Sequence, residues 1–162
     1  MAHDLLDAPS LYDTDVLAWS EQQAALIRAR RFSDNALDWD NIAEEIEDVG
    51  KNVYRGCRSQ LRNILAHLLK IEFIGPADVV PHWRGEIVGF RKELADELTP
   101  TIRHQLLEEV DGQFATALKA LVTKGKVVDP KRIRAARPGY TWDQIIDEDW
   151  YPEPRYGGAS PP

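Results

Sequence analysis

Six carboxylates within eleven positions form the densest run of chemically useful side chains in this sequence. They are Asp38, Asp40, Glu44, Glu45, Glu47 and Asp48. Side chains four residues apart share a face of a helix, where like charges repel one another. A cation relieves this repulsion, and Mg²⁺, Mn²⁺ and iron all accept carboxylate ligands. One interpretation is therefore a metal site within residues 40–48, with Glu44, Glu45 and Asp48 as ligands.

The same run is also typical of a solvated helix start. Carboxylates near a helix N-terminus are stabilised by the helix dipole, and Glu47 stands four residues before Lys51, where the two can pair. The pattern favours this structural interpretation over a metal site, because most charge runs are solvated faces.

His67 is the fourth candidate metal ligand. On one continuous helix it would lie about 33 Å from Glu45, since each residue adds about 1.5 Å. The two would meet only if the helix broke at Gly50 or Gly56 and folded back. No Glu-x-x-His pair occurs, so the usual di-iron signature of helical bundles is absent. The alternative for His67 is a partly buried, hydrogen-bonded side chain, which the sequence favours.

A basic segment over residues 124–137 is the third chemical signal. Lys131, Arg132 and Arg134 at its centre are candidates for phosphate contacts. The chain as a whole has a net charge of −7, whereas nucleic-acid-binding domains usually carry a basic excess. Pairing between this segment and the acidic stretches of the chain is the favoured alternative, so we do not expect nucleic acid as a partner.

One long helix over about residues 39–73 is the strongest structural prediction. Its apolar residues recur at steps of three and four, which is the period of one helix face. Gly50 and Gly56 are weak points, each costing about 1 kcal/mol relative to alanine. Cys57 falls on this face and is expected to be a core residue. The full apolar seam comprises Ile42, Ile46, Val49, Val53, Cys57, Leu61, Ile64, Leu68 and Ile71.

The remaining elements are also helical. Asp13 is expected to cap a helix that runs to about Phe32, and Pro81 to open another. The pair Thr99-Pro100 marks a further start, and that helix stops near Gly125. Short C-terminal helices are expected over about 130–136 and 142–147, the second of them capped by Thr141. The predicted fold is an all-α bundle of about four main helices, with a single domain over 11–152 and flexible tails at 1–10 and 153–162.

No stretch approaches the roughly 18 apolar residues of a membrane helix, and the N-terminus lacks the features of a signal peptide. The single cysteine excludes an internal disulfide and fits a reducing compartment. We therefore expect a cytoplasmic protein with no membrane partner.

Five fragments in a fixed order give the chain a family resemblance. They are LYDTDVLAW (11–19), LDWDNIAEEIEDVG (37–50), HLLK (67–70), HWR (82–84) and PGYTWDQIIDED (138–149). On these the chain resembles the bacterial family called domain of unknown function 29, over about residues 11–152. It departs from the commoner pattern at 71–82 and near 99–103. The resemblance implies a helical bundle of bacterial origin, with no established activity, cofactor or catalytic residue to transfer.

The function hypotheses then rank as follows. The first is an interaction or assembly module, because a long seam on one helix exceeds what a small bundle covers, and a second copy would bury the rest as a homo-oligomer, with a dimer favoured. The second is a metal-dependent enzyme using the carboxylates at 40–48. The third is nucleic-acid binding through 124–137. The sequence does not decide whether the chain is an enzyme or which cofactor it would use.

Overall fold

The computed structural model describes residues 10–29, 38–75, 77–124 and 139–155. Over these residues every regular element is a helix, as predicted. The helices are α1 (Leu11–Thr14), α2 (Val16–Ala29), α3 (Trp39–Phe73), α4 (Val80–Glu97), α5 (Pro100–Thr123) and α7 (Trp142–Ile146).

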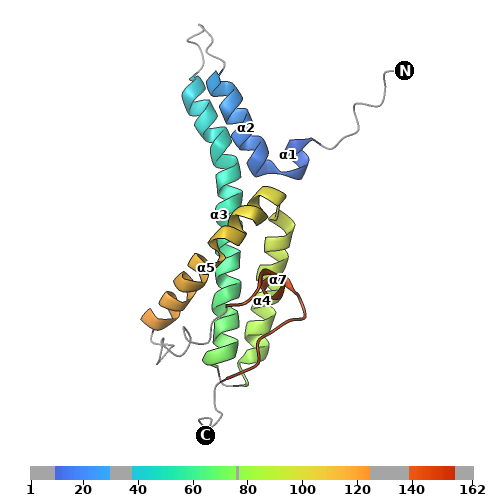
Figure 1. Ribbon diagram of the computed structural model, residues 1–162, viewed down its shortest axis with the longest axis vertical. Coiled ribbons are helices and arrows are strands. Elements are labelled where there is room, and N and C mark those ends of the chain that lie inside the picture. The colour runs from blue at the N-terminus through green and yellow to red at the C-terminus, as the bar shows by residue number, and fades with distance from the viewer. Residues whose placement is uncertain (1–9, 30–37, 76, 125–138, 156–162) are drawn as a thin grey trace, which may run out of the picture.

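Helix α3 is the axis of the molecule, and it is continuous through Gly50 and Gly56. The side chain of Asp38 caps its start by accepting a hydrogen bond from the backbone N–H of Asn41. Figure 1 shows two unequal parts along this axis. The C-terminal half of α3 lies among α4, α5 and α7, whereas its N-terminal half is paired with α2 in a two-helix projection, here called the arm (residues 16–29 and 39–53).

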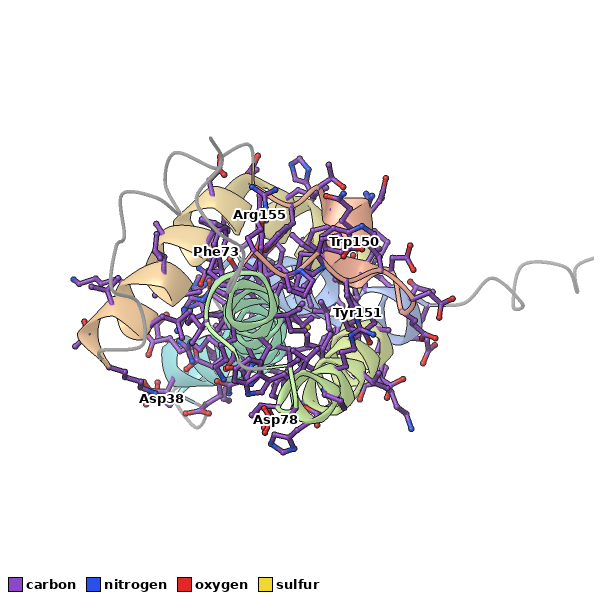
Figure 2. All side chains as sticks on the ribbon, turned by 90° about the horizontal axis from the view of Figure 1, so that it is seen from below. Asp38, Phe73, Asp78, Trp150, Tyr151 and Arg155 are labelled. Atoms are coloured by element: carbon purple, nitrogen blue, oxygen red, sulfur yellow. The ribbon has the colours of Figure 1, made fainter. Side chains whose placement is uncertain are left out.

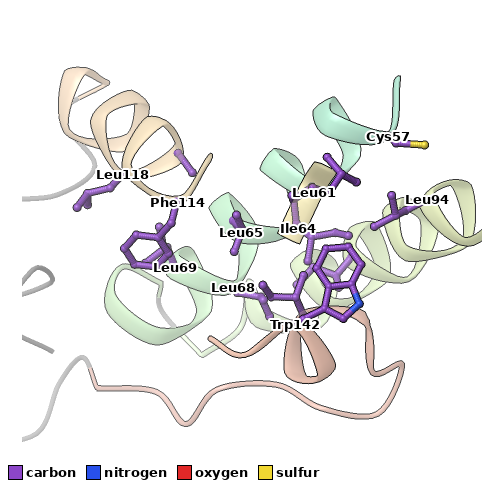
Figure 3. Packing of buried hydrophobic residues seen from close by; sticks show 14 of the residues in the cluster. Cys57, Leu61, Ile64, Leu65, Leu68, Leu69, Leu94, Phe114, Leu118 and Trp142 are labelled. Atoms are coloured by element: carbon purple, nitrogen blue, oxygen red, sulfur yellow. The ribbon is translucent and has the colours of Figure 1, made fainter. Parts of the chain in front are cut away.

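The hydrophobic core surrounds the C-terminal half of α3 (Figure 3). The predicted seam is fully buried here, because α4 and α5 pack on it from two sides. The core residues that α3 contributes are Cys57, Leu61, Ile64, Leu65, Leu68, Leu69 and Ile71, and α4, α5 and α7 add Ile87, Leu94, Ile102, Leu106, Phe114, Leu118, Trp142 and Ile145.

The prediction for the first helix was wrong at its start. A single turn, α1, ends at Asp15, whose φ of −154° and ψ of 83° are not helical, and α2 begins at Val16. Asp15 therefore takes the capping role that the sequence analysis gave to Asp13. The predicted end at Phe32 and the short helix at 130–136 lie outside the described residues.

Both predicted caps in the second half are confirmed. The Thr99 hydroxyl accepts a hydrogen bond from the N–H of Ile102 at the start of α5, with Pro100 as the first helical residue. Thr141 and Gln144 form a reciprocal capping box at the start of α7. These local signals were sufficient because each cap is satisfied within three residues of itself.

Candidate assembly surface and the predicted chemical sites

The arm is held together by small side chains. Ser20 and Ala24 of α2 and Ala43 of α3 are fully buried, and Gly50 of α3 is buried against α2. A Cβ atom on Gly50 would lie 2.1 Å from Ser20 Oγ and 2.9 Å from Leu17 Cα. The two helices therefore approach so closely at this point that only glycine fits.

This close approach moves the large residues of the predicted seam to one flank of the arm. Ile42, Ile46 and Val53 are only partly buried, and the side chain of Val49 is 46% exposed. Their spacing of four, three and four residues aligns them in one stripe along α3. This aliphatic stripe (Ile42, Ile46, Val49 and Val53) lies beside the line of Ala43 and Gly50 that contacts α2.

The opposite flank of the arm is charged. Glu47 follows Ile42 by five residues, so it faces roughly 140° away from the stripe. Arg28 of α2 donates a hydrogen bond of 2.7 Å to Glu47, and Lys51 lies 3.5 Å from the same carboxylate. The hydrogen bond from Arg28 lowers the pKa of Glu47 below its ordinary value. On this flank the surface ion pair of Arg28 and Glu47 joins α2 to α3.

The predicted carboxylate ligands do not converge. Glu44 and Glu45 are exposed on α3, and Asp48 lies 3.5 Å from the ammonium of Lys51. His67 stays in the same unbroken helix, about 33 Å from Glu45. Among the residues that the structure describes, no group of three or more His, Cys, Asp or Glu side chains is arranged to hold a metal ion. The structure thus lends the metal prediction no support, and Glu44, Glu45, Asp48 and His67 remain sequence candidates.

His67 has protein partners on both ring nitrogens. Its Nδ1 lies 2.8 Å from the carbonyl oxygen of Asn63, and its Nε2 lies 2.8 Å from Lys70 Nζ and 3.0 Å from a Glu86 carboxylate oxygen. Burial lowers the pKa of the ring below its ordinary value, and the charge of Lys70 adds to this effect. A neutral ring can donate from Nδ1 to Asn63 and accept at Nε2 from Lys70, whereas the Glu86 carboxylate would accept only from a protonated Nε2. This is the hydrogen-bonded, partly buried histidine of the structural interpretation.

Cys57 is a core residue, as expected. Only 2% of it is exposed, and burial, with a contribution from the charge of Glu97, raises the pKa of the thiol to about 11. A thiol with a raised pKa is a poor nucleophile near neutral pH. The candidate nucleic-acid residues Lys131, Arg132 and Arg134 lie outside the described residues.

Asp15 is the first polar residue whose role the sequence analysis missed. Its carboxylate accepts hydrogen bonds from the N–H of Ala18 (3.1 Å), the Thr99 hydroxyl (3.0 Å) and the N–H of Thr101 (2.8 Å). Ala18 lies in the first turn of α2 and Thr101 in the first turn of α5. One buried carboxylate therefore caps two helices at the base of the arm.

Arg91 is the second missed residue. It is 4% exposed, and its guanidinium donates to the carbonyl oxygens of Gln144 (3.1 Å), Ile145 (2.8 Å) and Trp150 (3.0 Å). The carbonyls of Gln144 and Ile145 lie in the last turn of the short helix α7, where a cation is favourable. One sequence feature could have indicated that Arg91 is buried: it stands four residues after Ile87, on the apolar face of α4.

Glu72 completes the attachment of the C-terminal segment. This carboxylate is 6% exposed, and it accepts a hydrogen bond from the Tyr140 hydroxyl (2.6 Å) and pairs with Arg155 Nε (2.8 Å). The backbone N–H of Arg155 also donates to the Glu72 carbonyl oxygen at 2.7 Å. Figure 2 shows Arg155 beside Phe73 at the end of α3, on the same side of the molecule as Trp150. Ordered contacts thus extend to Arg155, three residues past the predicted end of the domain.

Comparison with known proteins assigns the family. Residues 11–151 match the family described as domain of unknown function DUF29. The chain belongs to this family. A similar fold occurs in the crystal structure of an alpha-helical protein of unknown function from Rhodospirillum rubrum ATCC 11170. The two share 26% sequence identity and a TM-score of 0.64, over 88% of this chain and 93% of that one. The chain has no significant match among curated proteins.

These matches confirm the resemblance drawn from the five sequence fragments and the all-α fold. They assign no activity, because neither the family nor the similar structure has an established function. None of the described helices combines the length and the apolar character needed to cross a membrane.

Proposed function

We propose that this chain is an interaction and assembly module that associates with a second copy through the arm. The observation that carries the proposal is the aliphatic stripe of Ile42, Ile46, Val49 and Val53. The two helices of the arm meet at Ala43 and Gly50 of α3, so the large apolar side chains of α3 lie at the edge of that contact, where three are partly buried and Val49 is 46% exposed. Apolar surface of this kind is stabilised when a partner removes it from water.

A second copy is the partner that suits the arm best. Two arms laid stripe to stripe would bring four helices together, which is the smallest common bundle with an enclosed core. A two-fold symmetric pairing needs one self-complementary surface, and a row of aliphatic side chains meets this requirement without any charge pairing. The charged flank with Arg28 and Glu47 would then stay in solvent.

The test is the oligomeric state of the full chain in solution. We expect light scattering after size-exclusion chromatography to give the mass of a dimer at micromolar concentration. Val49→Glu should give a folded monomer, because a carboxylate in the paired stripe would lose its water. Val88→Glu is the matched control, since Val88 on α4 is 52% exposed and lies outside the arm. A monomeric natural chain, or a dimer that survives Val49→Glu and not Val88→Glu, would contradict the proposal.

We also propose a bacterial cytoplasmic location. The support is the single thiol, buried as Cys57, together with the bacterial source of the similar crystal structure. A metal-dependent enzyme and a nucleic-acid binder remain the two other hypotheses from the sequence, and no observation on the described residues favours either.

A further inference from the structure

An open groove of about 480 Å³ lies between α3 and α4, where α4 ends against the base of the arm. Val53, Gly56 and Cys57 of α3 line its floor, and Glu93, Asp96 and Glu97 of α4 line one rim. Its volume falls within the range of ligand-binding clefts, roughly 300–1,000 Å³. Val53 also belongs to the aliphatic stripe, so the groove continues the apolar flank of the arm.

Gly56 on the groove floor packs closely against none of the described residues of other elements. A Cβ atom there would meet nothing within 4 Å among the described residues, whereas one on Gly50 would collide with α2. A glycine inside a helix costs about 1 kcal/mol relative to alanine. A glycine at an open position leaves room for another backbone to approach closely. Gly85, Gly89 and Gly112 are equally open, and Gly56 differs from them in lining this groove.

The rim carboxylates are a second unfavourable feature at the same place. Asp96 and Glu97 occupy the last turn of α4, which carries no basic residue. Negative charge at a helix C-terminus opposes the helix dipole, so this arrangement destabilises α4. Among the described residues, no lysine, arginine or histidine lies within 4.0 Å of the carboxylates of Glu93, Asp96 or Glu97, and Glu93 accepts a hydrogen bond only from the amide of Gln60.

We propose that this groove receives a basic amphipathic helix from a different protein. Apolar side chains of that helix would lie on Val53 and over Gly56, and its lysines or arginines would pair with the three rim carboxylates. Both unfavourable features are thereby offset: the glycine admits the partner backbone, and the cations neutralise the end of α4. Residues that locally destabilise a helix, as the glycine and the carboxylates do here, are typical of functional surfaces.

A second copy of this chain is the weaker occupant. A two-fold pairing of the groove with itself would set Glu93, Asp96 and Glu97 against the same carboxylates, and like charges facing one another oppose association. The net charge of −7 points the same way. The inference goes beyond the proposed self-association, since it concerns a different partner and a groove that adjoins the stripe and shares Val53 with it.

The experiment is a titration of the full chain with two labelled model peptides, followed by fluorescence anisotropy. One is an amidated amphipathic helix of leucine and lysine, and the other has glutamate in place of every lysine. We expect only the lysine peptide to bind. Glu93→Gln combined with Asp96→Asn and Glu97→Gln should weaken its binding about tenfold or more, as expected for losing a cluster of charge pairs.

Two further comparisons separate the groove from general charge attraction. The triple variant Glu44→Gln, Glu45→Gln and Asp48→Asn removes the same charge from the exposed acidic row on the arm and should leave binding unchanged. Gly56→Leu fills the groove floor and should weaken binding about tenfold, and Gly56→Ala is the smaller change for use if the leucine variant unfolds.

Several results would overturn the inference: no binding of the lysine peptide, equal binding of the glutamate peptide, equal losses in the two triple variants, or unchanged binding by both Gly56 variants. Light scattering on each sample keeps the two proposals apart. A monomer that binds the lysine peptide would refute self-association only, and a dimer that Gly56→Leu dissociates would assign the groove to a second copy.

Discussion

The carboxylate of Asp15 accepts two backbone hydrogen bonds, one from the N–H of Thr101 at 2.8 Å and one from the N–H of Ala18 at 3.1 Å. One side chain therefore caps the first turns of α2 and α5, two helices that are far apart in the chain. The arm begins at α2 and the core helix α5 begins at the same point, so Asp15 fixes the arm to the bundle.

Asp15→Ala tests this double cap. Each lost cap costs about 0.5–2 kcal/mol, so the loss of two should lower the free energy of unfolding by about 1–4 kcal/mol in urea denaturation. Asp13→Ala is the control, because Asp13 is exposed and caps neither α2 nor α5, and it should change the stability by less than about 0.5 kcal/mol. Equal effects of the two variants would argue against the double cap.

The same carboxylate should contribute to acid lability. Burial acts to raise the pKa of Asp15, but hydrogen bonds from Thr101, Ala18 and Thr99 outweigh it and hold the pKa below its ordinary value. The stabilisation is complete above the unfolded pKa of about 3.9, and it is lost as the pH falls through the lower folded value. Stability curves from pH 5 to 2 should therefore fall less steeply for Asp15→Asn than for the natural chain.

Gly50 and Gly56 should respond in opposite directions to alanine. At Gly50 the added methyl group meets Ser20 Oγ at 2.1 Å and the backbone of Leu17, so we expect a net loss of about 1–3 kcal/mol. At Gly56 it meets nothing within 4 Å, so improved helix propensity should stabilise the chain by up to about 1 kcal/mol. Thermal unfolding of the two variants checks both signs, and destabilisation by Gly56→Ala would show that its surroundings are not open.

Glu72→Gln should loosen the C-terminal segment without unfolding the arm. The substitution removes the charge that pairs with Arg155 and weakens the bond from Tyr140, an effect of about 1–3 kcal/mol for hydrogen bonds to a charged group. Hydrogen exchange should accelerate over residues 139–155 and stay unchanged in α2. Glu153→Gln, at an exposed carboxylate of the same segment, should leave both regions as they are.

His67 should make the protein less stable as the pH falls below about 6.5. Burial, with the charge of Lys70, keeps the folded pKa below the unfolded value, so the unfolded chain binds the proton more tightly. Asn63, Lys70 and Glu86 face the ring in the folded state, with His82 Nε2 lying 3.7 Å from the Glu86 carboxylate.

The measurement is urea denaturation at a series of pH values between 7 and 5. His67→Gln should lose less stability over this range than the natural chain does. His104→Gln is the control, since His104 is exposed and pairs only with Glu108 in its own helix, so it should follow the natural chain. A natural chain whose stability rises toward pH 5 relative to His67→Gln would contradict the direction of the shift.

The elements of the fold were predictable where the signal is local. The three- and four-residue spacing from Ile42 to Ile71 predicted α3 to within a residue or two, and Thr99-Pro100 and Thr141 marked the starts of α5 and α7. In each case the deciding atoms lie within one or two helical turns of each other. The break at Asp15 was not predictable in this way, because the donor that completes its cap is 86 residues away.

The residue pattern along the chain also did not predict which polar residues are buried. Arg91 and Glu72 read as ordinary surface charges of their helices, yet each is buried because distant carbonyl, hydroxyl and guanidinium groups meet it. Only the position of Arg91 on the apolar face of α4 hinted at this role. For the proposed assembly surface, the spacing from Ile42 to Val53 predicted a shared face of α3 but not which part of that face α2 leaves exposed.

The sequence by itself determined the long helices, the caps at Thr99 and Thr141 and the family, because helical period and these caps depend on neighbours along the chain. Tertiary structure alone decided which part of the seam is covered. Ala43 and Gly50 let α2 approach so closely that Ile42, Ile46 and Val49 are left on the flank, whereas Leu61, Ile64 and Leu68 are enclosed by α4 and α5. Burial depends on what lies across space from a side chain, and residue order along one helix does not contain that information.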